Sequence, residues 1–284
     1  GAIGIVEGRI VSVGDFDAAT IGDAEVIDHR PHLIMPGFID THLHYVQSQM
    51  IASYAGSLLE WLNTYTFVEE QKFSQQGHAE AVASMFYDEL IRNGTTTAVA
   101  YCSSAPQSVD AFFAEAEKRN MLMVGGKVMM DRNAPEALCD TAQSSYDDSK
   151  ALIARWHGRG RGLYAISPRF AITSTPAQLA AAQALVEEHP DCYVQTHLSE
   201  NDAEIALSMQ LYPEAPDYTG IYEQYGLLGP RTLLGHCIHL NHRETAILAE
   251  TRSVAVFCPT SNLFLGSGLF DHARLSQNGV RIGV

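Results

Sequence analysis

Short apolar runs alternate with stretches of helical periodicity along most of the chain. The runs are residues 33–44, 95–102, 121–130, 163–170, 192–200, 232–240, 253–262 and 280–284. Runs that are apolar nearly throughout are typical of parallel strands buried on both faces. Stretches such as 175–189, with apolar residues at Leu179, Ala182 and Val186, have the spacing of a helix. The alternation predicts an α/β fold in which helices cover a parallel sheet.

Three of the predicted helices carry end signals. Gly94 follows the stretch 79–93 as a C-cap, and Thr175 precedes Pro176 as an N-cap. Asn241 and Glu244 have the spacing of a capping box before the next apolar stretch. These signals indicate where the helices begin and end.

Eight strand-like runs favour a closed (β/α)8 barrel of the TIM type over an open doubly wound sheet. No glycine-rich dinucleotide turn follows the first run, which also argues against the open sheet. The eighth run ends the chain, so we expect a barrel that is incomplete at its C-terminal end. Residues 2–13 alternate and turn at Glu7-Gly8, which predicts a hairpin too short to be stable alone. We therefore expect residues 1–32 to form part of a small β-sandwich domain and residues 33–284 to form the barrel.

Composition narrows the classes of function. The chain has 284 residues, 46% of them hydrophobic and 18% charged, and a formal net charge of −15. That charge argues against binding to a nucleic-acid backbone, and no apolar stretch is long enough for a membrane span. The first residues lack a secretory signal, and five widely spaced cysteines without a C-x-x-C pair are typical of reduced thiols. We expect a cytoplasmic protein without nucleic-acid or membrane partners.

Twelve histidines point to metal chemistry, and His42 and His44 are the first candidates. Two residues apart on a strand, they face the same side, which in a barrel is the interior. His197 closes a later strand and adds a third nitrogen at the same end of the barrel. Three nitrogen ligands with an open position match a catalytic zinc site, in which the bound water has a pKa of about 7. Iron accepts similar ligands, and hydrogen-bonded core histidines are the structural alternative.

Other polar residues follow the same strand ends. Glu200 lies three residues after His197, where a carboxylate could act as a proton shuttle or could be a solvated loop residue. His236 and His239 would face opposite ways on a strand, so we expect His236 inside the barrel and His239 in a structural role. His236 would hydrogen-bond the metal water or the substrate, or serve as an extra ligand. His78-Ala79-Glu80 matches the H-x-E of zinc deaminases by chance, because no P-C-x-x-C follows. The remaining histidines are expected to be ordinary surface residues: His29, His32, His78, His157, His189, His242 and His272.

Several motifs resemble a known family. PGFIDTHLH, SPRF, QTHLSEN, GHCIHL and FCPTSNLFLGSGLF resemble, in this order, the barrel motifs of the amidohydrolase superfamily, and specifically those of guanine deaminases. Residues 45–73 are similar to the same enzymes, and the resemblance extends from about residue 30 to residue 284. It implies hydrolysis of guanine to xanthine and ammonia in purine catabolism, one zinc ion per subunit and a homodimer.

The resemblance also implies roles for individual residues. His42, His44 and His197 match the metal ligands, and Glu200 matches the proton shuttle. The residues that would contact guanine are His44, Gln47, Arg169, Phe170, His197 and Glu200. An arginine fork suits the adjacent acceptors O6 and N7 of guanine, and Gln47 offers both a donor and an acceptor. Arg169 as an ion pair of the barrel rim and Phe170 as a core residue are the structural alternatives.

One departure and two other functions stay open. The family has a further ligand, an aspartate directly after strand eight, and this chain stops at Val284. We therefore expect a truncated chain that hydrolyses guanine poorly or not at all by itself. The alternatives are a related hydrolase of another aminated or halogenated heterocycle, and a non-catalytic metal-binding protein.

Overall fold

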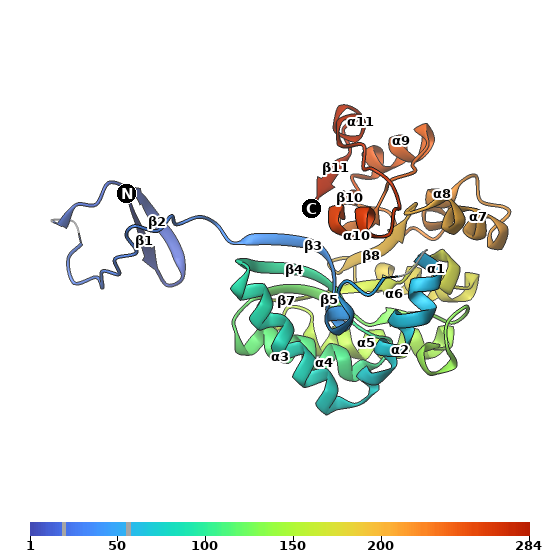
Figure 1. Ribbon diagram of the computed structural model, residues 1–284, viewed down its shortest axis with the longest axis horizontal. Coiled ribbons are helices and arrows are strands. Elements are labelled where there is room, and N and C mark those ends of the chain that lie inside the picture. Colours follow the sequence, from blue (N-terminus) through green and yellow to red (C-terminus); the bar gives the residue numbers. More distant parts are fainter. Residues whose placement is uncertain (19–20, 55–57) are drawn as a thin grey trace. The chain divides into compact units, whose positions relative to one another are not determined.

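The computed structural model describes residues 1–18, 21–54 and 58–284, which form two compact units, residues 1–36 and 37–284 (Figure 1). In the first unit, β1 (Ala2–Val6) pairs antiparallel with β2 (Arg9–Gly14), and Val6 lies opposite Arg9. Glu7 and Gly8 both have positive φ, 49° and 73°, as a two-residue hairpin turn requires. The predicted hairpin is confirmed. The β-sandwich around it stays a prediction.

The second unit is built on parallel strands. In chain order they are β3 (Phe38–His44), β4 (Thr95–Tyr101), β5 (Leu122–Gly126), β6 (Val128–Met129), β7 (Gly162–Pro168), β8 (Tyr193–Leu198), β9 (Thr232–His236), β10 (Val254–Val256) and β11 (Arg281–Gly283). The hydrogen-bonded order is β11-β10-β9-β8-β7-β5-β4-β3, with β6 beside β7. The backbone N–H of Thr41 donates to the carbonyl of Val284 at 2.9 Å, which joins β3 to the end of β11. This bond connects the two edges of the sheet, so the barrel is nearly closed.

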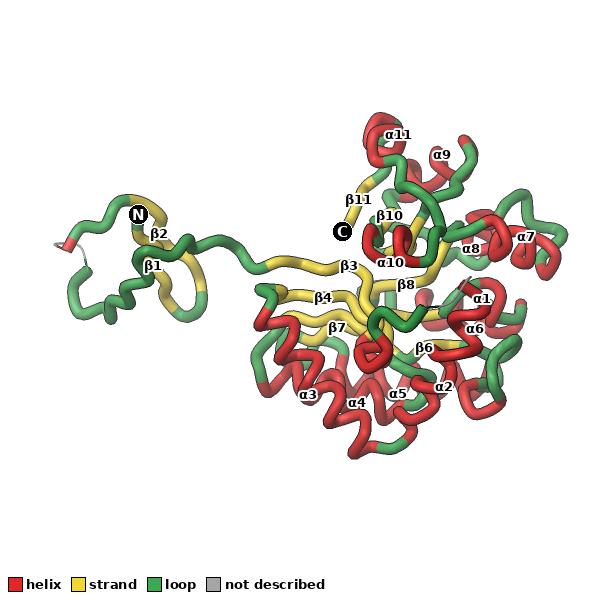
Figure 2. The backbone as a smooth tube through the Cα atoms, viewed as in Figure 1, coloured by secondary structure: helices red, strands yellow, loops and turns green. Residues whose placement is uncertain are grey.

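Helices surround the strands of this unit (Figure 2). They are α1 (Leu58–Trp61), α2 (Phe67–Glu70), α3 (Gln76–Arg92), α4 (Pro106–Lys118), α5 (Ala142–Trp156), α6 (Pro176–Glu188), α7 (Asp202–Leu211), α8 (Tyr218–Gln224), α9 (His242–Thr251), α10 (Pro259–Phe264) and α11 (His272–Gln277). The predicted helix ends are confirmed. Gly94 has a φ of 81°, Thr175 accepts from the N–H of Gln178 at 3.3 Å, and Asn241 and Glu244 form a reciprocal capping box. The alternation of strands and helices confirms the predicted (β/α)8 architecture.

The barrel interior is filled below its mouth. Val99, Val124, Ala165, Leu233 and Val256, from five different strands, form one buried cluster. Such layers of branched side chains are typical of barrel cores. They leave the C-terminal ends of the strands as the place where polar side chains can gather.

The described helices and the cysteines bear on membrane insertion and on disulfide formation. None of the described helices combines the length and apolar content that crossing a bilayer requires. The five cysteines form no disulfide with one another, and four of them are buried.

Replacing Thr175 with alanine should lower the free energy of unfolding by about 1 kcal/mol, because α6 loses its N-cap acceptor. Urea denaturation of the wild type, Thr175→Ala and Thr175→Ser measures the effect. Serine keeps the hydroxyl and should retain most of the stability. Equal losses in both variants would contradict the capping role.

Candidate functional site

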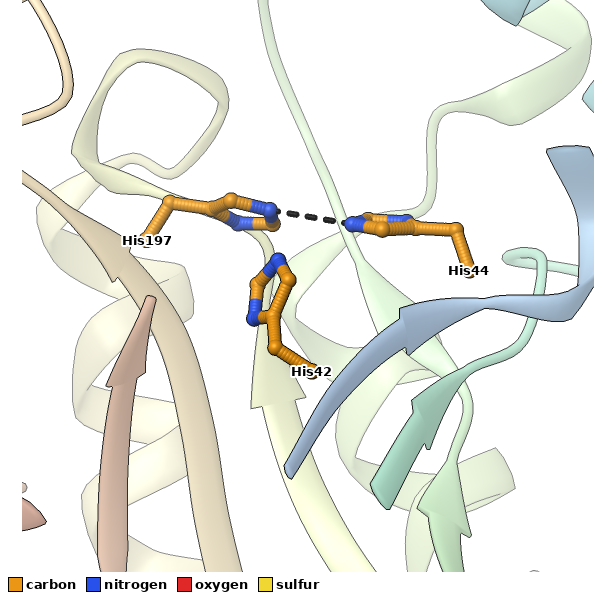
Figure 3. Close-up of side chains that lie close together, drawn as sticks. All are labelled: His42, His44 and His197. Atoms are coloured by element: carbon orange, nitrogen blue, oxygen red, sulfur yellow. Dashed lines mark hydrogen bonds between the residues drawn. The ribbon is translucent and has the colours of Figure 1, made fainter. Parts of the chain in front are cut away.

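Three histidines converge at the C-terminal ends of β3 and β8. One ring nitrogen of each of His42, His44 and His197 lies within 4.8 Å of the others. Figure 3 shows the three rings pointing toward one another, with Nε2 of His44 3.0 Å from Nε2 of His197. The structure therefore brings together the three residues that the sequence predicts as metal ligands.

The ring of His197 is held by the residue that follows β7. The carbonyl oxygen of Arg169 accepts from the backbone N–H of His197 at 3.1 Å and from its Nδ1 at 2.7 Å. Because a carbonyl can only accept, Nδ1 carries the proton and the lone pair of Nε2 faces His44. A second hydrogen bond of this kind is what orients metal-binding histidines in proteins.

The other two rings are held by packing. His44 stacks on the ring of Tyr101 with centroids 4.4 Å apart and an interplanar angle of 9°. The ring of His42 lies against Gly235 of β9, where an added Cβ would come within 2.4 Å of its Cε1. Only glycine allows this close approach. The position of His42 therefore depends on the residue opposite it in the barrel.

The histidine cluster fits a metal ion. Burial lowers the pKa of His42, His44 and His197 well below its usual value, so all three are neutral, as metal binding requires. Two nitrogens bound tetrahedrally to one zinc ion lie about 3.3 Å apart, given Zn–N bonds of about 2.0–2.1 Å. The observed 3.0 Å between the Nε2 atoms of His44 and His197 is close to this spacing.

Glu200 and His236 form a buried pair beside the cluster. Nε2 of His236 lies 3.3 Å from Oε2 of Glu200, and Ser267 donates to the other carboxyl oxygen at 3.2 Å. Asn262 Oδ1 accepts from Nδ1 of His236 at 2.8 Å, which leaves Nε2 facing the carboxyl group. Burial raises the pKa of Glu200 to about 7 and lowers the pKa of His236. Both shifts favour the neutral forms of the two side chains, and a pKa of about 7 lets the Glu200 carboxyl group exist in either form at neutral pH.

His236 and His239 do not lie on one strand, contrary to the expectation that strand alternation turns them in opposite directions. Strand alternation cannot relate His236 to His239, because β9 ends at His236, whose φ is 75°. The chain turns there, and Nε2 of His239 bonds the carbonyl of Ser267 at 2.8 Å. His236 is nevertheless buried, and His239 does make a structural contact.

A cavity of about 1000 Å³ opens beside the histidines. Its lining includes Gln47, Arg169 and Phe170, together with the three histidines, Glu200 and His236. Phe170 lies in an apolar cluster, with its ring centroid 6.2 Å from that of His197. Arg169 is 3% exposed and pairs with Glu70 at 2.6 Å. Arg169 therefore forms an ion pair and also lines the cavity. Phe170 likewise belongs to an apolar cluster and also lines the cavity.

The prediction for the remaining histidines is correct for four of them and wrong for three. His29, His32, His242 and His272 are exposed, whereas His78, His157 and His189 are partly buried. His157 accepts from the backbone N–H of Tyr164 at 3.0 Å, and its Nε2 bonds Asp191 at 3.1 Å. It is a structural residue that joins a helix end to neighbouring strands. The segment 78–80 lies in α3, which supports the interpretation of its H-x-E pattern as chance.

Sequence reasoning missed Glu204, which supports Glu200. Its carboxylate accepts from the backbone N–H groups of Glu200 at 2.7 Å and of Asn201 at 3.2 Å, and from the hydroxyl of Tyr218 at 2.8 Å. Asn201 and Glu204 form a capping box at the start of α7. That three-residue spacing is visible in the sequence and could have identified Glu204.

A parallel α/β barrel with a histidine cluster at its mouth is the class of protein that fold and site define. The family model described as the amidohydrolase family matches residues 33–284. The chain belongs to the amidohydrolase family.

The relatives are enzymes of one kind. The chain is 50% identical to the guanine deaminase of Escherichia coli (strain K12) over 100% of its own length and 65% of that protein. It is 40% identical to the probable guanine deaminase of Deinococcus radiodurans, over 98% of its length and 64% of that protein. The chain thus spans about 65% of the length of these relatives.

Solved structures of guanine deaminases have the same fold as this chain. The guanine deaminase from Bradyrhizobium japonicum superposes with a TM-score of 0.96 at 40% identity, covering 99% of this chain and 61% of that one. The guanine deaminase from C. acetobutylicum, with guanine bound in its active site, gives 0.92 at 30% identity, covering 99% and 67%.

Replacing Gly235 with alanine should displace His42, because the new Cβ would lie 2.4 Å from Cε1 of its ring. We expect at least tenfold weaker binding of a divalent metal ion, in line with the loss when a metal ligand's support is removed. Metal content after dialysis against graded chelator measures the effect. Gly229→Ala is the matched control, because its added Cβ would meet no atom within 4 Å. Equal metal retention in both variants would contradict this packing role.

Stability should also depend on the buried carboxyl group of Glu204, whose pKa burial raises from 4.5 to about 7. A raised pKa means that this group's stabilising contribution is complete below about pH 4.5 and is lost as the pH rises through about 7. Glu204→Gln removes this dependence, so its melting temperature relative to wild type should be higher at about pH 8 than at about pH 5. Exposed Glu214→Gln controls for the loss of a carboxyl group as such, and a flat difference for Glu204→Gln would refute the assignment.

Proposed function

We propose that the chain is the substrate-binding barrel of a guanine deaminase, which hydrolyses guanine to xanthine and ammonia. The observation that carries the proposal is the cavity in which buried Arg169 and partly buried Gln47 lie beside the histidine cluster and Glu200. The relatives support it, since those at 50% and 40% identity are a guanine deaminase and a probable one. We propose zinc as the ion at His42, His44 and His197, and a cytoplasmic homodimer acting in purine catabolism.

The cavity wall suits one edge of guanine. Its O6 and N7 are adjacent acceptors, and the Arg169 guanidinium can donate to both through its free N–H groups. Phe170 would lie against the apolar face of the purine. His44, His197 and Glu200 line the same cavity, so the amino group at C2 can be directed toward them.

The reaction needs a nucleophile and a proton carrier. A divalent metal at the three histidines would act as a Lewis acid that activates water for attack on C2. Glu200 would take one proton from this water and deliver it to a ring nitrogen as the oxygen adds to C2. It would then take the proton of the hydroxyl group added at C2 and deliver it to the amine, which departs as ammonia and leaves a carbonyl group at C2. Its pKa of about 7 suits both steps, because the carboxyl group gains and loses a proton readily at neutral pH. His236, 3.3 Å away, would hold the carboxyl group in place through Nε2.

The decisive assay uses the full-length protein that contains this chain. Loss of guanine absorbance with release of one ammonia per guanine, abolished by a chelator and restored by zinc, is the expected result. Turnover of another aminated or halogenated heterocycle but not of guanine would overturn the substrate assignment. Metal binding without any turnover would favour a non-catalytic protein.

Glu200→Gln should lower kcat for guanine by about 10²- to 10⁴-fold, because glutamine cannot carry the proton. Zinc content and the melting temperature should stay close to wild type, since the amide keeps the shape of the side chain. Steady-state kinetics with metal analysis on the same sample provide the measurement. Full activity in this variant would exclude the shuttle role, and Glu214→Gln controls for loss of a surface carboxylate.

A further inference from the structure

Glu70 is a fully buried carboxylate at the end of α2 that contacts two residues of the cavity wall. Its Oε1 accepts from Nε2 of Gln47 at 3.0 Å, and its Oε2 accepts from Nη1 of Arg169 at 2.6 Å. The side chain is 0% exposed, and Glu70 lies behind the cavity lining rather than in it. One carboxylate therefore connects both of the polar groups proposed to bind the purine.

The contact with Arg169 compensates a buried charge. An unpaired guanidinium at 3% exposure would be strongly destabilising, whereas the Glu70 carboxylate neutralises it. The ring of Phe67, from the same helix, lies 5.4 Å from the guanidinium carbon. Nη1 is the atom that binds Glu70, and within residues 1–18, 21–54 and 58–284 the Nε and Nη2 donors have no hydrogen-bond partner, so they remain for a ligand. Helix α2 thus fixes both the position of the guanidinium and the donors that it presents.

The contact with Gln47 fixes which end of an amide faces the ligand. A carboxylate only accepts, so the nitrogen of Gln47 must face Glu70 and the amide oxygen must point away. Among the described residues, no hydrogen-bond donor contacts the amide oxygen of Gln47. Gln47 also lines the cavity. It therefore presents an acceptor there, beside the donors of Arg169.

We propose that Glu70 is a specificity-determining positioning residue that sets this pattern of donors and acceptor. The inference rests on the proposed function and deepens it. Guanine carries the acceptor O6 beside the donor N1–H, which matches a guanidinium next to an amide oxygen. A purine with an amino group at C6 and no hydrogen on N1 presents the opposite pattern, so donors would meet a donor. Such unpaired buried groups are the basis of strong discrimination between similar ligands.

Glu70→Gln tests the proposal, because an amide can accept from only one of its two neighbours and leaves Gln47 free to turn over. For guanine we expect KM to rise on the order of tenfold to a hundredfold, the cost of one lost hydrogen bond to a charged group. We expect kcat to change less than KM. The preference for guanine over 2,6-diaminopurine, measured as the ratio of kcat/KM values, should fall by a similar factor.

The matched control is Glu69→Gln, a neighbouring carboxylate of α2 that pairs with Lys72 and does not line the cavity. It should leave the ratio for the two purines unchanged. A Glu70→Gln enzyme that loses activity on both purines equally, with the ratio intact, would reduce Glu70 to a structural role and overturn the proposal. The proposed function would stand in that case, because it fails only if the wild-type protein does not turn over guanine.

A second variant covers the case in which Glu70→Gln does not fold. Gln47→Met removes the amide while leaving the Glu70–Arg169 pair intact. It should lose the preference for guanine over 2,6-diaminopurine to a similar extent, with the zinc content unchanged. An unaltered preference in this variant would equally overturn the proposal.

Discussion

The candidate site depends on Arg169, because its backbone carbonyl contacts the histidine cluster and its guanidinium contacts the cavity wall. Its carbonyl oxygen accepts from Nδ1 of His197 and so directs the other ring nitrogen toward His44. Its guanidinium pairs with Glu70 behind the cavity wall. The distance between the candidate metal position and the proposed purine contacts is therefore fixed largely within one residue, directly after β7.

Residues on regular strands could be predicted from the sequence, and those on irregular segments could not. His42, His44 and His197 follow from the period of a strand and the rule that barrel sites lie at the C-terminal strand ends. His236 is buried as expected, but strand alternation is not the cause, since β9 ends at this residue. Glu70 could not be predicted, because residues 45–75 show neither strand nor long helical periodicity. Its role also depends on contacts with Gln47 and Arg169, which lie 23 and 99 positions away in the sequence.

The fold explains why these contacts can be so short. The nine parallel strands bring residues from distant parts of the chain to one end, and the apolar layer beneath that end excludes water. The same burial raises the pKa of both Glu200 and Glu204 to about 7. A closed barrel thus supplies position and proton affinity together, whereas the hairpin of residues 2–14 provides neither.

The bond network around Glu70 has a consequence for how such a site can change over generations. Gln47 and Arg169 both donate to the carboxylate of Glu70. Replacing any one of the three residues therefore leaves a polar group of a neighbour without its hydrogen-bond partner. A single substitution that favours a different heterocycle would therefore lower stability or activity, and a second, compensating substitution would be required. We therefore expect these three positions to vary together in the family, as an epistatic unit, while the histidine cluster remains independent of the choice of base.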